Sequence, residues 1–216
     1  MEIGVLGTGM VGRTIGSKLV NLGHQVMLGS RSEANPTAIT WAKKLDSPHA
    51  LYGNFRNAAS FGEIVFNCTL GSASLGALHQ AGADNLRGKI LIDVSNPIDY
   101  SAEKFTLTEC NTDSLGEEIQ RTFPEARVVK TLNTMNCNLM VEPNKLPGNT
   151  SVFVSGNDPK AKETVEMILR DWFGWRSIID LGDIYTARGV EMYMSLWATL
   201  QKVIPAERIN IKVMSA

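Results

Sequence analysis

The sequence lacks an excess of charge of either sign, because its 216 residues include 21 Lys and Arg against 22 Asp and Glu. Proteins that bind nucleic acid through its phosphates need a basic excess, so this class is disfavoured. Cysteine is scarce, and an odd count of three excludes a complete disulfide framework and favours a reducing compartment. No apolar run approaches the roughly 18 residues of a membrane span, and the first ten residues do not look like a secretion signal. We therefore expect a cytoplasmic protein with neither a nucleic-acid nor a membrane partner.

The first thirty residues predict a strand, a glycine turn, a helix and a second strand. Residues 3–6 form a short β-type run that stops at Gly7. Residues 10–22 then repeat apolar side chains every three or four positions, which is the spacing of one helix face. Residues 25–28 are again β-type. Two strands joined through a helix in this way form a βαβ unit, the repeating element of a parallel sheet.

The alternation of strands and helices continues along the rest of the chain. We expect further strands near residue 51 and over residues 63–67, 89–94, 127–132, 151–155 and 177–180, and helices near residue 57 and over residues 36–45, 75–81, 111–122, 159–172 and 183–202. This order predicts an α/β, Rossmann-type fold, with a doubly wound, mostly parallel sheet between helices. The length leaves no room for a second full catalytic domain. We expect one main domain over residues 1–156 and a small helical C-terminal extension over residues 157–216, which completes the sheet and caps its cleft.

The turn after the first strand carries the pattern G-x-G-x-x-G. It reads Gly7, Thr8, Gly9, Met10, Val11, Gly12 and it opens a helix, which is the context required of a dinucleotide-binding fingerprint. The first glycine permits a tight turn, the second lets the backbone approach a pyrophosphate, and the third lets the helix pack close to the strand. The helix N-terminus offers free N–H groups and partial positive charge to the phosphates. These six residues are therefore predicted to bind a dinucleotide.

The end of the second strand distinguishes between the two nicotinamide dinucleotides. NAD sites usually place Asp or Glu there to accept hydrogen bonds from the ribose 2′-hydroxyl. Here the strand runs into Ser30 and Arg31, and the first acidic residue is Glu33. A serine hydroxyl can donate to a 2′-phosphate, and a guanidinium can pair with it and stack on the adenine. The sequence therefore predicts NADP(H) as the cofactor, held by Ser30 and Arg31 in an NADP-binding domain.

Two further loops are expected to complete the cleft, because ligands of open α/β sheets bind beyond the carboxyl ends of the strands. Thr69, Leu70 and Gly71 follow one strand, and Ser95, Asn96 and Pro97 follow another. We expect both loops to flank the ribose and the nicotinamide. Plain turn chemistry is the alternative explanation, since Thr-x-Gly and Asn-Pro are common loop formers.

Segments spread over nearly the whole chain resemble those of a known family. They are GTGMVGRTIGSKLVNLGHQVMLGSR near the start, IDVSNPID (92–99), VVKTLNTMN (128–136), FVSGNDPKAKETV (153–165) and DLGDIYTARGVEMYMSLW (180–197). They are similar to segments of the NADP-dependent coenzyme F420 oxidoreductases, whose fold also forms the cytoplasmic domain of the STEAP metalloreductases. The resemblance implies a Rossmann domain with a small C-terminal piece, usually a homodimer. Such proteins move hydride between NADP(H) and a flat redox acceptor such as coenzyme F420 or a flavin.

One position departs from this family. Archaeal F420 enzymes carry a histidine beside the deazaflavin where this chain has Asn133. Asparagine can hydrogen-bond a polar ring edge but does not titrate near neutral pH. Asn133 and Met135 are thus candidates for the acceptor site, with ordinary core packing as the alternative for Met135. The identity of the hydride acceptor stays open: it could be a deazaflavin, a flavin, a ferric chelate or another conjugated molecule.

The sequence offers no evident acid–base or metal-binding group. His49 and His79 have no Cys, Asp or His at metal-ligand spacing. Tyr100 and Lys104 match the Y-x-x-x-K of short-chain dehydrogenases, but the glycine spacing and the turn around the tyrosine do not. We therefore expect no metal and no catalytic side chain, with hydride passing directly between cofactor and acceptor.

Two other functions fit the same residues. The protein could be an NADPH-binding sensor or regulatory module without turnover, since neither role requires a catalytic residue. It could also be an NADPH-dependent reductase of a small carbonyl or imine, although that reaction normally needs a proton donor. An NADP(H)-dependent oxidoreductase acting on a flat small-molecule acceptor is the main prediction.

Overall fold

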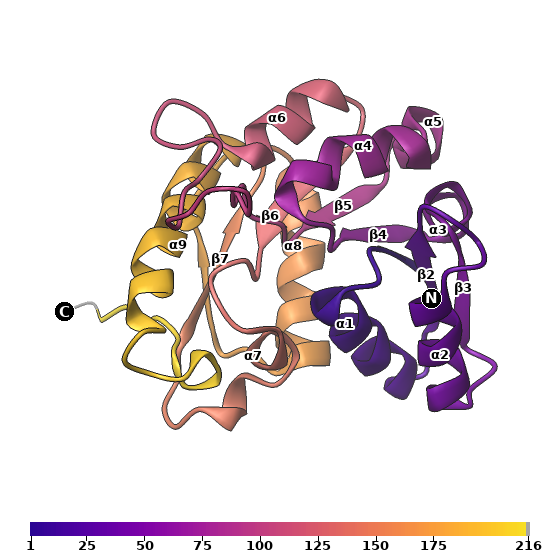
Figure 1. The fold of residues 1–216 in the computed structure, drawn as a ribbon, viewed down its shortest axis with the longest axis horizontal. Helices are drawn as coiled ribbons and strands as arrows, with labels where there is room; N and C mark the ends of the chain where they lie inside the picture. The colour runs from indigo at the N-terminus through magenta and orange to yellow at the C-terminus, as the bar shows by residue number, and fades with distance from the viewer. Residues whose placement is uncertain (215–216) are drawn as a thin grey trace.

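Eight strands form one sheet in the computed structural model, which describes residues 1–214 (Figure 1). The strands are β1 (Glu2–Leu6), β2 (Gln25–Ser30), β3 (Ala50–Asn54), β4 (Ile64–Asn67), β5 (Ile90–Asp93), β6 (Arg127–Thr131), β7 (Ser151–Ser155) and β8 (Ser177–Asp180). Their order is β3-β2-β1-β4-β5-β6-β7-β8, and only β6 and β7 pair antiparallel. This arrangement confirms the predicted α/β, Rossmann-type, mostly parallel sheet.

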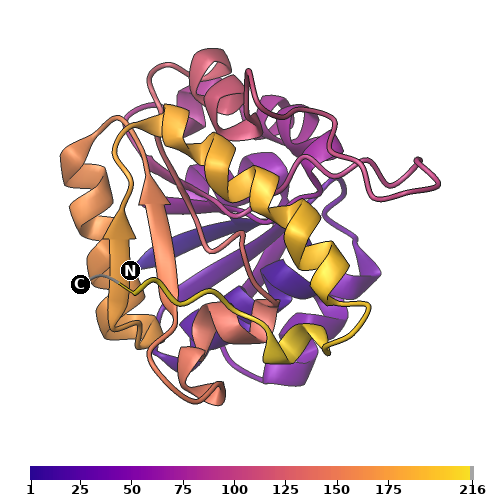
Figure 2. The ribbon, with the colours of Figure 1, turned by 90° about the vertical axis from the view of Figure 1, so that its left-hand side faces the viewer.

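Helices cover both faces of the sheet (Figures 1 and 2). They are α1 (Met10–Asn21), α2 (Pro36–Leu45), α3 (Phe55–Phe61), α4 (Gly71–Ala81), α5 (Ala83–Leu86), α6 (Leu115–Thr122), α7 (Cys137–Val141), α8 (Pro159–Met167) and α9 (Ala187–Leu200). Buried residues of α1, α2, α7 and α8 share one hydrophobic core, whereas those of α3 to α6 and the start of α9 belong to another. The sheet therefore lies between two helical layers.

The central strands are mostly apolar because they are buried on both faces. In β5, for example, Ile90 and Ile92 belong to the first core and Leu91 to the second, and all three are 5 % exposed or less. Successive side chains of a strand point to opposite faces, so a continuous apolar run is needed to fill both cores. This is why the β-type runs could be recognised in the sequence.

Several boundaries differ from the sequence predictions. Helix α4 begins at Gly71, four residues before the predicted start. Helix α6 begins at Leu115 and not at Asn111, because Asn111 adopts a left-handed conformation and the Ser114 side chain caps the helix. The prediction also missed α7, which is capped by Asn136, and it treated the turn from Ile184 to Thr186 as part of α9.

Helix α9 runs diagonally across the molecule, beside β7 and in front of the rest of the sheet (Figure 2). It packs against α6, and its backbone accepts a hydrogen bond from the segment that follows β6. This position brings the C-terminal part of the chain over the parallel strands. Among the described residues, none of the helices has the length and apolar character needed to cross a membrane.

Candidate functional site

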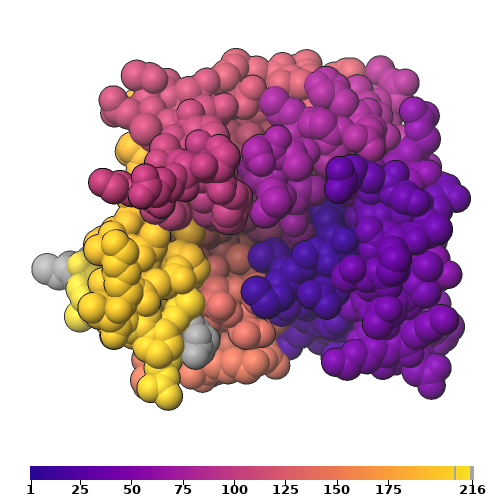
Figure 3. All heavy atoms as spheres, viewed as in Figure 1, coloured from indigo at the N-terminus to yellow at the C-terminus, as the bar shows by residue number. Residues whose placement is uncertain are grey.

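A cavity of about 520 Å³ opens where the central parallel strands end. It is lined by residues of three loops and the helices that follow them: Gly7, Thr8, Gly9, Met10, Val11, Cys68, Thr69, Leu70, Gly71, Val94, Ser95, Asn96, Ile98 and Tyr100. Beside it, a hollow is visible between α9 and the start of α1 (Figure 3). The carboxyl ends of the strands, where open α/β sheets bind ligands, thus form the cavity wall.

The three glycines of the fingerprint have three different surroundings. Gly7 has φ +113°, and a Cβ there would lie 2.6 Å from the carbonyl oxygen of Cys68. A Cβ on Gly12 would lie 2.0 Å from the carbonyl oxygen of Gly7, so helix and strand pack too closely for a side chain. A Cβ on Gly9 would meet nothing within 4 Å. Gly9 thus borders open space in the cavity, as expected of the glycine that a pyrophosphate approaches.

Two helix N-termini face this cavity. Helix α1 starts after Gly9 and α4 after Leu70, and neither of these N-cap residues caps the helix with its side chain. In α4 the Ala73 N–H donates to the Leu70 carbonyl at 2.9 Å. The other N–H groups at the starts of the two helices retain donor capacity and partial positive charge. A Cβ on Gly71 would lie 2.0 Å from the carbonyl oxygen of Asn96, which brings the second N-terminus against the loop after β5. The arrangement can bind an anion with backbone groups alone.

Ser30 and Arg31 lie next to the glycine turn, because the Gly7 N–H donates to the carbonyl of Gly29 at 2.9 Å. Ser30 is buried, and its hydroxyl donates to the carbonyl of Ser32 at 2.6 Å. Arg31 is exposed and has no ion-pair partner among the side chains that the structure describes. The carboxylate of Glu33 accepts a hydrogen bond from Asn54 at 2.8 Å. Arg31 therefore places an exposed cation at the end of β2, where an NAD site usually carries Asp or Glu.

Large apolar side chains stand exposed around the cavity. Met10 is 67 % exposed, Leu70 57 % and Tyr100 67 %, although all three line it. Exposing such side chains to water is unfavourable, and a bound molecule would cover them. The rim therefore suits a ligand that presents an apolar surface.

A buried group of charged residues lies beneath the same end of the sheet. Asp93 of β5 and Lys130 of β6 are register partners on adjacent strands, and Glu191 comes from α9. Lys130 Nζ lies 2.7 Å from Asp93 Oδ2 and 2.7 Å from Glu191 Oε1, and no more than 1 % of any of the three side chains is exposed. Burial alone would lower the pKa of Lys130, but the two carboxylates outweigh it and raise the pKa above its usual value. We call these three residues the buried triad.

The buried triad has further hydrogen bonds that limit its cost. Lys130 Nζ also donates to the carbonyl of Ser95 at 2.6 Å. Glu191 accepts from the N–H groups of Leu115 and Gly116, at 2.9 and 3.0 Å, which are the first two residues of α6. The second carboxylate thus faces a helix N-terminus, where negative charge is favourable. Together these bonds attach α9 and α6 to the loop that lines the cavity.

A second set of buried hydrogen bonds reaches the loop after β4. Asn67 Nδ2 donates to Asp93 Oδ1 at 2.8 Å, and Asn67 Oδ1 accepts from the hydroxyl of Thr69 at 2.7 Å. The Thr69 hydroxyl also lies 2.9 Å from that of Ser74 in α4. The loops after β4 and β5 are therefore held by the same carboxylate.

Neither of the two predicted acceptor-site residues lines the cavity, but Asn133 contacts Asn96, which does. Asn133 is 2 % exposed, and its side-chain N–H groups donate to Asn96 Oδ1 at 2.8 Å and to the Val190 carbonyl at 3.1 Å. Leu132, directly before it, has φ +61°, a conformation that costs energy in a non-glycine residue. Met135 is 4 % exposed and belongs to the hydrophobic core. Asn133 thus joins the loop after β5 to α9.

Other chemically active side chains have structural surroundings. His24 stacks on Trp172 with ring centroids 4.2 Å apart, and burial lowers its pKa. Burial, and secondarily Asp93, raises the pKa of Cys68 and keeps the thiol protonated. Within residues 1–214 there is no cluster of three or more His, Cys, Asp or Glu that could hold a metal ion.

Most of the predicted cofactor residues lie together in the structure. Ten of them line the cavity: Gly7, Thr8, Gly9, Met10, Val11, Thr69, Leu70, Gly71, Ser95 and Asn96. Gly12, Pro97, Ser30 and Arg31 do not line it. The sequence did not single out Cys68, Val94 or Ile98 as lining residues, and Tyr100 was considered only as a catalytic candidate and not placed at the rim. The buried triad was missed as well. Charged residues within the apolar strands KILIDV and RVVKT were the available signal for the triad.

Comparisons with known proteins agree with this geometry. The family model described as NADP oxidoreductase coenzyme F420-dependent matches residues 2–97. A crystal structure from Arthrobacter sp. FB24, provisionally described as an F420-dependent NADP-reductase, is 48 % identical, covers 100 % of both chains and has a TM-score of 0.94. The chain belongs to the family of coenzyme F420-dependent NADP oxidoreductases.

Two curated relatives extend this family assignment. The F420-dependent NADP reductase of Methanocaldococcus jannaschii is 26 % identical over 99 % of this chain and 98 % of its own. Metalloreductase STEAP3 of Rattus norvegicus is 31 % identical over 88 % of this chain. The chain spans only about a third of that rat protein, since the match covers 36 % of its length. The predicted resemblance to both groups is confirmed.

Proposed function

We propose that this protein transfers hydride between NADPH and a flat redox acceptor such as coenzyme F420 or a flavin. The observation that carries the proposal is the cavity where two uncapped helix N-termini and the open side of Gly9 converge. Backbone donors placed in this way suit a pyrophosphate. Family membership supports NADP(H) as the dinucleotide.

The chain's own residues would bind and orient both reactants. The turn from Gly7 to Gly12 would hold the pyrophosphate, and Ser30 and Arg31 the 2′-phosphate. The loops of Thr69–Gly71 and of Asn96–Pro97 would flank the ribose and nicotinamide. When bound, NADPH supplies the hydride, so the protein needs only to align the reacting carbons and exclude water.

A flat acceptor is favoured by the cavity's composition. Its lining contains no His, Asp, Glu or Lys, and its one thiol, Cys68, is held protonated. A carbonyl or imine reductase normally needs a positioned proton donor, and the Tyr100 hydroxyl at the rim is the available candidate. Ring acceptors need close stacking instead, which exposed Met10 and Leu70 can provide.

The experiment is an acceptor panel followed by loss of NADPH absorbance. Coenzyme F420, FMN, FAD, ferric chelates and small carbonyls or imines are offered in turn to the purified protein. We expect NADPH oxidation with at least one ring acceptor and little with NADH. Tight NADPH binding without turnover on any acceptor would favour the sensor alternative. Turnover on carbonyls or imines alone, if it is abolished in Tyr100→Phe, would favour the carbonyl or imine reductase alternative.

We also propose a homodimer and a cytoplasmic location. Met192 and Leu196 on α9, together with Val203, expose 38 %, 55 % and 79 % of their surface, which a second copy could cover. Cys68, Cys110 and Cys137 form no disulfide within the described chain, in keeping with a reducing compartment. Size-exclusion chromatography with light scattering tests the dimer. The division of the chain at residue 156 stays a prediction.

A further inference from the structure

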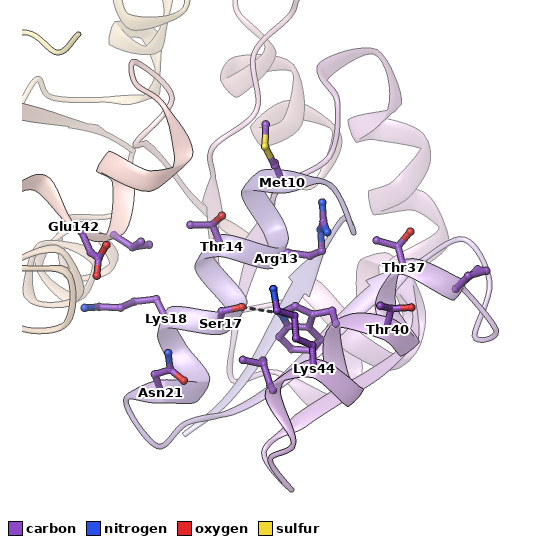
Figure 4. A pocket seen from close by; sticks show the side chains of 14 residues that line it. Met10, Arg13, Thr14, Ser17, Lys18, Asn21, Thr37, Thr40, Lys44 and Glu142 are labelled. Carbon is purple, nitrogen blue, oxygen red and sulfur yellow. Dashed lines mark hydrogen bonds between the residues drawn. The ribbon is translucent and has the colours of Figure 1, made fainter. Parts of the chain in front are cut away.

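A groove outside the dinucleotide cavity runs along the outer face of α1 (Figure 4). It has a volume of about 750 Å³, and its walls are α2 on one side and the end of α7 on the other. Its lining includes Arg13, Lys18, Lys44, Trp41 and Glu142. The fold does not require these cations, since the helices already bury Ile15 and Leu19 of α1 on their opposite face.

The lining of the groove has three cationic side chains and one carboxylate, so positive charge is in excess. Arg13, Lys18 and Lys44 form no ion pair with any described side chain, and Arg13 Nε donates only to the carbonyl of Gly9 at 3.3 Å. The one carboxylate of the lining, Glu142, is paired with Lys145, which lowers its pKa, with a smaller effect from Lys18. The groove is therefore complementary to a ligand with anionic groups.

The wall formed by α2 is fixed by close packing and adds hydroxyl groups. Trp41 is 6 % exposed, and its Nε1 donates to the hydroxyl of Ser17 at 2.9 Å. A Cβ on Gly16 would lie 3.0 Å from the Trp41 ring, so the glycine lets the ring pack against α1. Thr37 and Thr40 also line the groove. Hydroxyls beside cations suit phosphate or carboxylate oxygens.

The groove begins at the dinucleotide cavity, since Met10 lines both. It also adjoins the acceptor end of the site, because the Thr14 hydroxyl lies 3.7 Å from Cys137 Sγ at the start of α7. Helix α7 follows within a few residues of Asn133. A molecule with its ring at the nicotinamide could therefore extend a chain along α1.

The geometry points to a binding site for an anionic side chain of the hydride acceptor, in the groove of Arg13, Lys18 and Lys44. This inference rests on the proposed function and narrows its substrate class to flat acceptors that bear phosphate or carboxylate groups on a flexible chain. Exposed ion pairs each strengthen binding by about two- to fivefold, so three cations acting together should strengthen it about tenfold or more. Salt should weaken the effect.

The test uses pairs of acceptors with the same ring. Oxidised FMN is compared with riboflavin, and coenzyme F420 with its deazariboflavin core that lacks the anionic chain. Binding of each to the protein saturated with NADP⁺ is measured by calorimetry, so no turnover is needed. In each pair of acceptors, we expect the anionic compound to bind about tenfold more tightly than the compound without the anionic chain at low salt. At high salt this difference in affinity should disappear.

The double variant Lys18→Gln/Lys44→Gln tests whether the tighter binding of anionic acceptors arises in the groove. It should reduce the advantage of the anionic acceptor at least about fourfold, while the matched variant Lys43→Gln, on the exposed part of α2 outside the groove, keeps it. Equal binding of both members, or an advantage that survives in the double variant, would overturn the inference. If both acceptors of a pair bind equally and are reduced by NADPH, the proposed function stands but the inference about the groove does not. If no ring compound binds, both fail.

Discussion

The two ends of the dinucleotide cavity are built in different ways. Around Gly9 the site consists of backbone N–H groups and exposed side chains, with Arg31 extended into solvent. Around Asn96 it consists of buried side chains, joined to Asp93 and Lys130 by hydrogen bonds and ion pairs. Under the proposed function the first end would hold phosphates, for which backbone donors suffice. The second end would fix the distance and angle of the hydride transfer, for which a rigid buried wall is suited.

The largest effect on stability is expected when Lys130, the cation of the buried triad, is removed. Lys130→Met leaves Asp93 and Glu191 buried without their shared partner, and should lower the free energy of unfolding by about 3–5 kcal/mol. The matched variant Lys162→Met removes an ion pair with Asp180, whose side chain is partly exposed, and a hydrogen bond to the Gly182 carbonyl, and should cost about 1–2 kcal/mol. Urea unfolding measures both. Similar losses in the two variants would show that the buried triad is not what holds the wall.

The backbone end is tested by two glycine substitutions. Gly9→Ala meets no atom of the protein within 4 Å, so it should leave the melting temperature unchanged while it weakens NADPH binding at least about tenfold. Gly12→Ala would place a Cβ 2.0 Å from the Gly7 carbonyl oxygen and should lower stability as well. Thermal melts and fluorescence titration with NADPH distinguish them. A stable Gly9→Ala protein with unchanged NADPH affinity would contradict the pyrophosphate assignment.

Removal of the exposed Arg31 side chain should raise the KM for NADPH but not the KM for NADH. Arg31→Ala is expected to raise the KM for NADPH about tenfold, since one charge-assisted contact with the 2′-phosphate is lost. The KM for NADH should change little. Steady-state kinetics with an accepted ring compound measures both, with Arg176→Ala on the distant edge of the sheet as control. Equal changes for the two cofactors would mean that Arg31 does not recognise the 2′-phosphate.

The smallest effect concerns a carboxyl group near the wall. Burial, then hydrogen bonding to Glu118 and the charges of Glu118, Asp113 and Glu191, raise the pKa of Glu109 to about 7. The folded protein therefore holds a proton that the unfolded chain releases above about pH 4.5, so stability should fall as pH rises from 5 to 7. Glu109→Gln should flatten this decline in melting temperature. An unchanged pH profile in the variant would exclude Glu109 as its source.

The sequence predicted the backbone end of the site better than the wall. The fingerprint from Gly7 to Gly12 is local, and its position between a strand and a helix depends on periodicity that a single chain displays. The triad is not local: Asp93, Lys130 and Glu191 are up to 98 residues apart, counted along the chain. Only strand register makes Asp93 and Lys130 partners. Such pairing follows from tertiary structure, which propensity and spacing do not encode.

The acceptor residues illustrate the same limit. Asn133 could be placed after a strand from its sequence, but not the two hydrogen bonds that turn its side chain toward Asn96 and Val190. Its role toward an acceptor stays a prediction. Helix α7 was missed for a related reason, because five residues are too few to display helical periodicity.

Direct hydride transfer from NADPH to a ring acceptor can be followed with an isotope label. The protein is given NADPH deuterated at the transferring position of the nicotinamide, together with a 5-deazaflavin, whose accepting atom is a carbon that retains the label. Mass spectrometry of the reduced product should find one deuterium per molecule. Oxidation of NADPH without deuterium in the product would exclude direct hydride transfer to the ring.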